Sequence, residues 1–134
     1  MFWSLRAAAI LSMGLWLAAL VGRFDVYLHG FGYNYGWFLL VLGWIGPLEL
    51  SFAWFANIPY LICIYQLLRG QIPRTNMVLG SCALASTALV PHFELDKDGR
   101  FHPVLFWGPA VWLWLLAFIP ILATVLVRRT LDAR

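Results

Sequence analysis

The chain has 134 residues, of which 63% are hydrophobic and 11% charged, and its formal net charge is +3. Soluble domains carry roughly 25% charged residues, and a soluble monomer this small could not hide so much apolar surface from water. The basic residues form no patch interleaved with exposed aromatic residues, so the charge does not indicate nucleic-acid binding. We expect the lipid bilayer to solvate the outer surface.

Four apolar segments are long enough to cross a bilayer, since a spanning helix needs about 20 apolar residues. The predicted spans are residues 5–22, 47–68, 75–91 and 104–127, and external loops cover residues 23–46 and 92–103. The sequence therefore predicts an all-α integral membrane protein with a single membrane-embedded domain. The expected fold is a four-transmembrane-helix bundle with a short interfacial helix before the second span.

The first apolar segment has one basic residue, Arg6, near its start. A basic start and an apolar core are also typical of a secretory signal peptide, but no clean small-residue cleavage site precedes Arg23. We therefore expect an uncleaved first helix. The loop that follows alternates glycines with Phe31, Tyr33 and Tyr35, and tyrosine side chains favour the headgroup zone.

Residues 37–68 are too long for one span and too short for two. A single helix of this length would extend about 48 Å, whereas the hydrocarbon core is about 30 Å thick. Gly46 and Pro47 mark the expected break, because proline favours the first turn of a helix. Residues 37–45 are then an interfacial or re-entrant segment, with one long second helix as the alternative. Pro59 lacks a backbone N–H, which predicts a kink in the second span.

The third and fourth apolar segments differ in composition. Residues 75–91 are rich in small side chains, which let helices approach closely in lipid, so we expect this helix to be the most enclosed of the four. In the next loop, Asp98 and Gly99 form a turn signal that predicts a small β-hairpin. Pro109 suits the first turn of the last helix, and Pro120 predicts a kink within it.

The charge distribution predicts the orientation. With both termini in the cytoplasm, the inner segments are net positive and the outer segments net negative, as the positive-inside rule requires. The residues that set this topology lie at span ends: Arg69, Arg74, Arg128 and Arg129. Most tryptophans then fall in the outer half and are expected to form an aromatic belt: Trp37, Trp44, Trp54, Trp107, Trp112 and Trp114. We predict a bacterial-type inner (plasma) membrane location.

Glu49 is the main candidate for a binding site within the apolar segments. A charge at membrane depth is costly and often functional, and helical spacing places Glu49 on one stripe with Asn57 and Tyr60. These three residues could bind a cation or relay a proton. Two structural explanations stay open. Glu49 suits the first turn of a helix, where it complements the helix dipole near the headgroups, and Asn57 could bond a neighbouring helix.

His92 and His102 flank the predicted hairpin and could bind a transition metal if its strands pair and a carboxylate joins them. An interfacial loop anchored by aromatic rings explains the same residues, so we predict no metal and no cofactor. The sequence contains no nucleophile–base arrangement, phosphate loop or dinucleotide fingerprint. We therefore expect no enzyme activity.

These features favour a non-enzymatic accessory or interaction subunit, with an assembly, scaffold or immunity-type role. Its expected partners are the lipid bilayer and another membrane protein or a second copy of the chain, but not nucleic acid. The alternative is a small oligomeric transporter, or an ion- or proton-conducting bundle, that uses Glu49 and Asn57. Few polar residues lie within the spans, which argues against a wide aqueous pathway.

Overall fold

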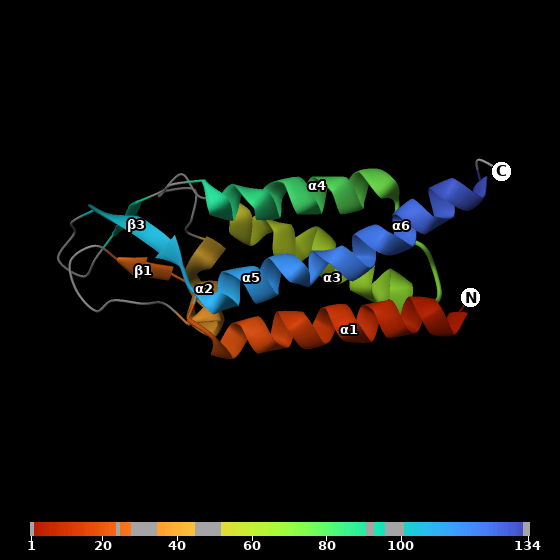
Figure 1. Ribbon diagram of the computed structural model, residues 1–134, viewed down its shortest axis with the longest axis horizontal. Coiled ribbons are helices and arrows are strands. Elements are labelled where there is room, and N and C mark those ends of the chain that lie inside the picture. The colour runs from red at the N-terminus through yellow and green to blue at the C-terminus, as the bar shows by residue number, and fades with distance from the viewer. Residues whose placement is uncertain are drawn as a thin grey trace.

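A computed structural model describes residues 2–23, 25–27, 35–44, 52–90, 93–95 and 101–132, with side chains for residues 4–23, 35–44, 52–90 and 107–131. Within these ranges the chain forms a helical bundle that carries a small antiparallel sheet at one end (Figure 1). Both chain termini lie at the opposite end of the bundle. The predicted helical bundle is confirmed, and the sheet is an addition to it.

The α-helices are, in chain order, α1 (Phe2–Val21), α2 (Gly36–Leu42), α3 (Asn57–Leu68), α4 (Thr75–Ser86), α5 (Pro109–Leu116) and α6 (Phe118–Asp132). The 3₁₀ helix η2 (Ala53–Ala56) leads into α3, and the 3₁₀ helix η3 (Thr87–Leu89) follows α4. The strands are β1 (Asp25–Tyr27), β2 (Phe93–Leu95) and β3 (Phe101–Trp107). Helix α1 packs against α3, α5 and α6, while α4 packs against η2, α3 and α6.

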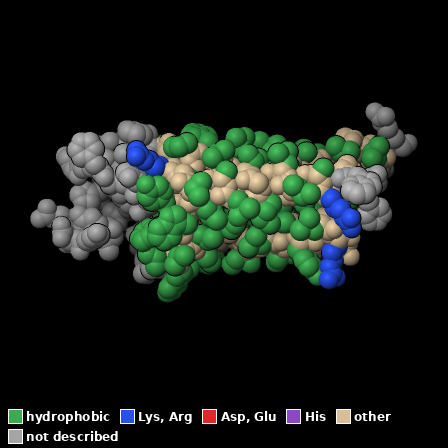
Figure 2. Space-filling model, turned by 90° about the horizontal axis from the view of Figure 1, so that it is seen from below, with side chains coloured by type: hydrophobic (Ala, Val, Ile, Leu, Met, Phe, Trp, Pro, Cys, Tyr) green, Lys and Arg blue, Asp and Glu red, His purple; other side chains and the backbone are tan. Residues whose placement is uncertain are grey.

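Two helical segments are long and apolar enough to cross a membrane, Ser4–Val21 and Pro109–Leu131. Two shorter apolar segments, Ala53–Leu68 and Thr75–Leu89, lie between them in the chain. Fewer than half of the residues in these segments are buried in the described structure, 28% in Ser4–Val21 and 39% in an 18-residue window of Pro109–Leu131. Figure 2 shows that hydrophobic side chains cover the middle of one face of the bundle. The basic side chains visible on this face lie only at its two ends.

Three prolines produce the irregularities that the sequence predicts. Pro109 occupies the first turn of α5, as expected. The last apolar segment is interrupted at Ala117, between α5 and α6, because Pro120 has no N–H to donate to the preceding turn. Pro59 lies in the first turn of α3, directly after η2. The irregularity at Pro59 is therefore a change from 3₁₀ to α-helix, and the predicted kink of this span stays a prediction.

The sheet has the strand order β1-β3-β2, and both pairings are antiparallel. Strands β2 and β3 pair in the antiparallel way that the predicted hairpin requires, with Glu94 opposite His102. The turn signal itself, Asp98 and Gly99, lies outside the described residues. The other edge of β3 pairs with β1, where Asp25 lies opposite Trp107. The prediction that residues 25–27 belong to a loop was therefore wrong. A three-residue strand with no alternating pattern gives no signal of its own.

The start of the last helix was also predicted wrongly. Residues 104–107 complete β3 instead of beginning a helix at position 104. Their β-branched and aromatic side chains suit a strand as well as an apolar helix. The helix begins only at Pro109, because the residue before a proline avoids the α region, and Gly108 is indeed extended, with φ −69° and ψ 168°.

Helix α4 does not bury all of its small residues. Ser81 and Ala85 are buried, whereas Gly80, Ala83 and Ser86 are exposed on the outer face. The expectation that this helix is the most enclosed is wrong for that face. Composition alone does not reveal which side of a helix its small residues occupy.

The predicted short helix before the second span is present as α2, which lies against the end of α1. The Gly36 N–H donates to the Gly22 carbonyl at 3.1 Å. A Cβ atom at Gly36 would lie 2.1 Å from the carbonyl oxygen of Ala19, so only glycine permits this approach. Gly36 thus fixes how closely α2 approaches the end of α1.

Candidate functional site

A hydrogen-bonded cluster lies in the centre of the bundle, around Asn57 at the start of α3. The indole N–H groups of Trp16 on α1 and Trp114 on α5 both donate to Oδ1 of Asn57, each at 3.0 Å. Nδ2 of Asn57 donates to the Trp54 carbonyl at 2.9 Å. All three bonds are made by buried or half-buried groups, so one amide side chain ties together three helical segments.

A second polar chain lies one helical turn further along α3. Ser12 Oγ lies 2.8 Å from the Tyr60 hydroxyl oxygen and donates to the Ala117 carbonyl at 2.6 Å. Because serine has a single hydroxyl proton and uses it on Ala117, the Tyr60 hydroxyl must donate to Ser12. Ser12 and Tyr60 are both 0% exposed. Their hydroxyls therefore bond at the point where Pro120 interrupts the last helix.

Aromatic rings surround these polar groups. The Tyr60 ring packs against Trp16 at 6.3 Å and against Phe118 at 4.9 Å between centroids. Trp114 meets Phe118 edge-on at 5.4 Å. A further bond joins α4 to this region, since buried Ser81 donates to the Ala56 carbonyl at 3.0 Å. The cluster consists of Ser12, Trp16, Asn57, Tyr60, Ser81 and Trp114, and we call it the central cluster.

The hydrogen bonds of the central cluster connect neighbouring helices to one another. In a low-dielectric interior, unpaired polar groups are costly, and here each bond supplies a partner to a buried donor or acceptor. The Asn57 carbonyl oxygen already accepts two N–H groups. A cation at this oxygen would have to displace an indole donor.

The candidate binding residues of the sequence fall on different parts of the chain. Asn57 and Tyr60 lie on one face of α3 and both belong to the central cluster. Glu49 and His92 lie outside the described residues. His102 lies in β3, opposite Glu94 in the register. The use of Glu49, Asn57 and Tyr60 in binding stays a prediction.

Sequence reasoning missed the partners of Asn57 and Tyr60. Ser12 was a usable signal, because it is a hydroxyl residue in the middle of a strongly apolar helix. Trp16 was another signal, since a tryptophan far from either end of an apolar helix needs a partner for its N–H. Trp114 was expected in an outer aromatic belt but is buried, which corrects that assignment.

The sheet end of the bundle carries exposed aromatic side chains. Trp37 and Trp44 on the α2 segment and Trp112 on α5 are exposed. Trp54 and Trp107 instead donate to backbone carbonyls, those of Leu40 and Ala88 at 2.9 and 2.7 Å. The predicted belt is thus partly outward-facing rings and partly rings that anchor backbone at the same end.

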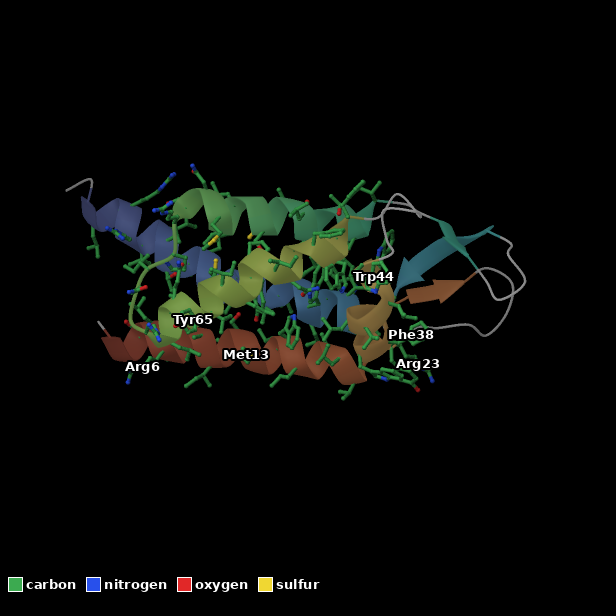
Figure 3. The ribbon with its side chains drawn as sticks, turned by 180° about the vertical axis from the view of Figure 1, so that it is seen from behind. Arg6, Met13, Arg23, Phe38, Trp44 and Tyr65 are labelled. Carbon is green, nitrogen blue, oxygen red and sulfur yellow. The ribbon has the colours of Figure 1, made fainter. Side chains whose placement is uncertain are left out.

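The topology-setting arginines lie together at the opposite end. Arg69 follows the last residue of α3, and Arg74 precedes α4. Arg128 and Arg129 lie in the last turns of α6, next to the chain termini (Figure 1). Of the arginines whose side chains the structure describes, only Arg23 lies at the sheet end (Figure 3). The bundle is therefore polarised, with most of these arginines at the end that holds the termini and exposed tryptophans at the sheet end.

One apolar cavity opens between α4 and the last two helices. It has a volume of about 140 Å³ and is lined by Cys82, Ala85, Leu115, Phe118, Ile119 and Leu122. No side chain in this lining carries a charge. Cys63 and Cys82 are free thiols.

No protein-family model, no curated protein and no solved structure matches this chain.

Proposed function

We propose that this chain is a four-span protein of a bacterial-type inner membrane and that it acts as a non-enzymatic accessory or interaction subunit. The proposal places α1, η2 with α3, α4 with η3, and α5 with α6 across the bilayer. Both termini then face the cytoplasm and the sheet faces outward. The arginine-rich end matches the positive-inside rule, and the exposed tryptophans match an outer interfacial belt.

The observation that supports an interaction role most strongly is the closed interior. The polar side chains of the central cluster bond to one another and to backbone carbonyls, and the bundle packs small and aromatic residues around them. A conducting pathway instead needs polar groups that line water or a substrate route. The features left to contact a partner are the sheet and the exposed rings of Trp37, Trp44 and Trp112.

Site-specific photo-crosslinking in living cells tests this role. A photoreactive amino acid at Trp37 or Trp44 should give discrete protein adducts, either with a partner or with a second copy of the chain. The matched control is Ile119, an equally exposed apolar position on α6, which should contact mainly lipid. Absence of a protein adduct at both tryptophan positions would contradict the proposal.

The transport alternative rests on Glu49, Asn57 and Tyr60 and has its own test. Purified protein in liposomes with an entrapped pH-sensitive dye would show proton flux, and Glu49→Gln or Asn57→Ala would reduce it. If the variants and the wild-type chain all show only the leak of empty liposomes, the alternative loses its chemical basis.

A further inference from the structure

Arginines account for every charged side chain in the described side-chain ranges, 4–23, 35–44, 52–90 and 107–131. They are Arg6, Arg23, Arg69, Arg74, Arg128 and Arg129. Within these ranges no carboxylate neutralises the exposed guanidinium groups of Arg6 and Arg69. These two groups can therefore bind an anion from outside the chain.

Two of these arginines, Arg6 on α1 and Arg69 directly after α3, lie near the end of α3. Nε of Arg6 on α1 donates to the carbonyl of Leu68, the last residue of α3, at 3.3 Å. Arg69 is the next residue, and its guanidinium carbon lies 4.6 Å from the centroid of the Tyr65 ring. Figure 3 shows Arg6 and Tyr65 at the same end of the α1–α3 pair, with Met13 nearer the centre of α1. The two guanidinium groups therefore flank the junction of α1 and α3.

Both groups are held in place but keep most of their hydrogen-bonding capacity. A guanidinium has five N–H donors, and Arg6 uses its Nε–H on Leu68, which leaves its four terminal N–H groups. Arg69 is stacked on a ring, which constrains its plane without using its donors. Phosphate oxygens accept two parallel N–H bonds from such a planar fork.

An apolar track leads away from the arginine pair along α3. Tyr65, Ile62 and Ile58 are spaced three to four residues apart, so they form one stripe with Arg69, and all three are exposed. On α1, Ile10 and Leu17 are exposed on the stripe that includes Arg6. A charged group at the end of an apolar track matches the shape of a phospholipid, with its headgroup at the interface and its acyl chains beside the helices.

We propose that Arg6 and Arg69 together bind the phosphate of an anionic phospholipid, of the phosphatidylglycerol class, whose acyl chain lies along the Tyr65–Ile58 stripe. The proposal rests on the membrane placement given above. A lipid fits better than free phosphate because the arginine pair continues directly into exposed apolar surface. The competing account is that Arg6 only caps the free carbonyls at the end of α3.

The test is lipid retention by the purified, delipidated protein in detergent, measured by native mass spectrometry. Phosphatidylglycerol and phosphatidylcholine of identical chains are offered at equal concentration, with inorganic phosphate as a separate probe. The wild-type chain should retain phosphatidylglycerol preferentially. Arg6→Gln/Arg69→Gln should lower that preference by roughly fivefold for each arginine removed. Arg128→Gln/Arg129→Gln removes the same charge from the same end and should leave it unchanged.

Arg6→Lys/Arg69→Lys keeps the positive charge that sets topology but removes the planar guanidinium. This variant should insert into the membrane normally, so a change in its lipid preference cannot be blamed on failed insertion. This pair should still lower the preference. Equal loss in both glutamine pairs, no preference in the wild-type chain, or displacement of the lipid by inorganic phosphate at equal concentration would each overturn the lipid site. Failure to retain either lipid would overturn the lipid site as well. The membrane placement is tested separately, by whether the chain is recovered in the membrane fraction of cells, so the two proposals fail in different ways.

Discussion

Trp16 and Trp114, which lie on α1 and α5, donate their indole N–H groups to the same atom, Oδ1 of Asn57, each at 3.0 Å. Asn57 thus supplies the acceptor for both indole N–H groups, and the two tryptophans supply the donors for its Oδ1 atom. This relationship joins the first, second and last long apolar segments of the chain at one buried point. Stability of the bundle should depend on that point more than on any single apolar contact.

Asn57→Leu should lower the free energy of unfolding by about 1–3 kcal/mol, because it keeps the branched shape of the side chain and leaves two buried indole N–H groups without an acceptor. The check is reversible unfolding in detergent micelles, followed by tryptophan fluorescence. Asn76→Leu, an exposed position on α4, is the matched control and should change stability little. Equal effects of the two substitutions would contradict the role assigned to Asn57.

Ser12 and Tyr60 should give unequal effects, although they share one hydrogen bond. Ser12→Ala leaves the buried Tyr60 hydroxyl without an acceptor and the Ala117 carbonyl without the hydroxyl that donates to it. The free energy of unfolding should therefore fall by about 1–3 kcal/mol. Tyr60→Phe leaves Ser12 bonded to Ala117 and should cost only about 0.5–1.5 kcal/mol. The double variant should lose less than the sum, and strict additivity in the unfolding measurements would argue against a shared chain of bonds.

Gly36→Ala should destabilise the bundle by about 1–3 kcal/mol, since the new methyl group collides with backbone atoms of α1. Thermal unfolding in detergent measures the effect. Gly80→Ala is the control, because a Cβ there meets nothing within 4 Å and alanine favours a helix. A smaller loss at position 36 than at position 80 is the outcome that would refute the close contact of α2 with α1.

Gln66 carries a buried side-chain oxygen, Oε1, that finds no hydrogen-bond partner within the described part of the chain. Replacing an unsatisfied buried acceptor with an apolar group of similar shape removes its desolvation cost. Gln66→Met should therefore leave the unfolding free energy unchanged or raise it. A loss above about 1 kcal/mol in the same assay would mean that Oε1 has a partner that the substitution removed.

Local chemistry made several features predictable from the sequence. Pro109 marks a helix start because the chain cannot be helical at the residue before it, and Pro120 marks an interruption because it lacks a donor. The turn signal between β2 and β3 likewise acts within a few residues. Each of these predictions depends on one residue and its immediate neighbours.

Features that depend on contacts between distant segments could not be predicted in the same way. Strand β1 is defined only by its pairing with β3, and nothing within Asp25–Tyr27 marks it as a strand. Asn57 was recognised as a polar residue in an apolar segment, but its partners lie on two other helices. The same limit explains why Trp114 was placed in an outer belt, since the side of α5 that faces α3 is set by packing.

The most direct test of the four-span arrangement is to determine on which side of the membrane three positions lie. Single cysteines at Gln71, Thr130 and Asp98, in a Cys63→Ala/Cys82→Ala background, would be treated in intact cells with a membrane-impermeant thiol reagent. The account predicts labelling at position 98 without disruption, and labelling at positions 71 and 130 only after the membrane is opened. Labelling of position 71 or 130 in intact cells, or protection of position 98, would contradict the four-span arrangement with both termini in the cytoplasm.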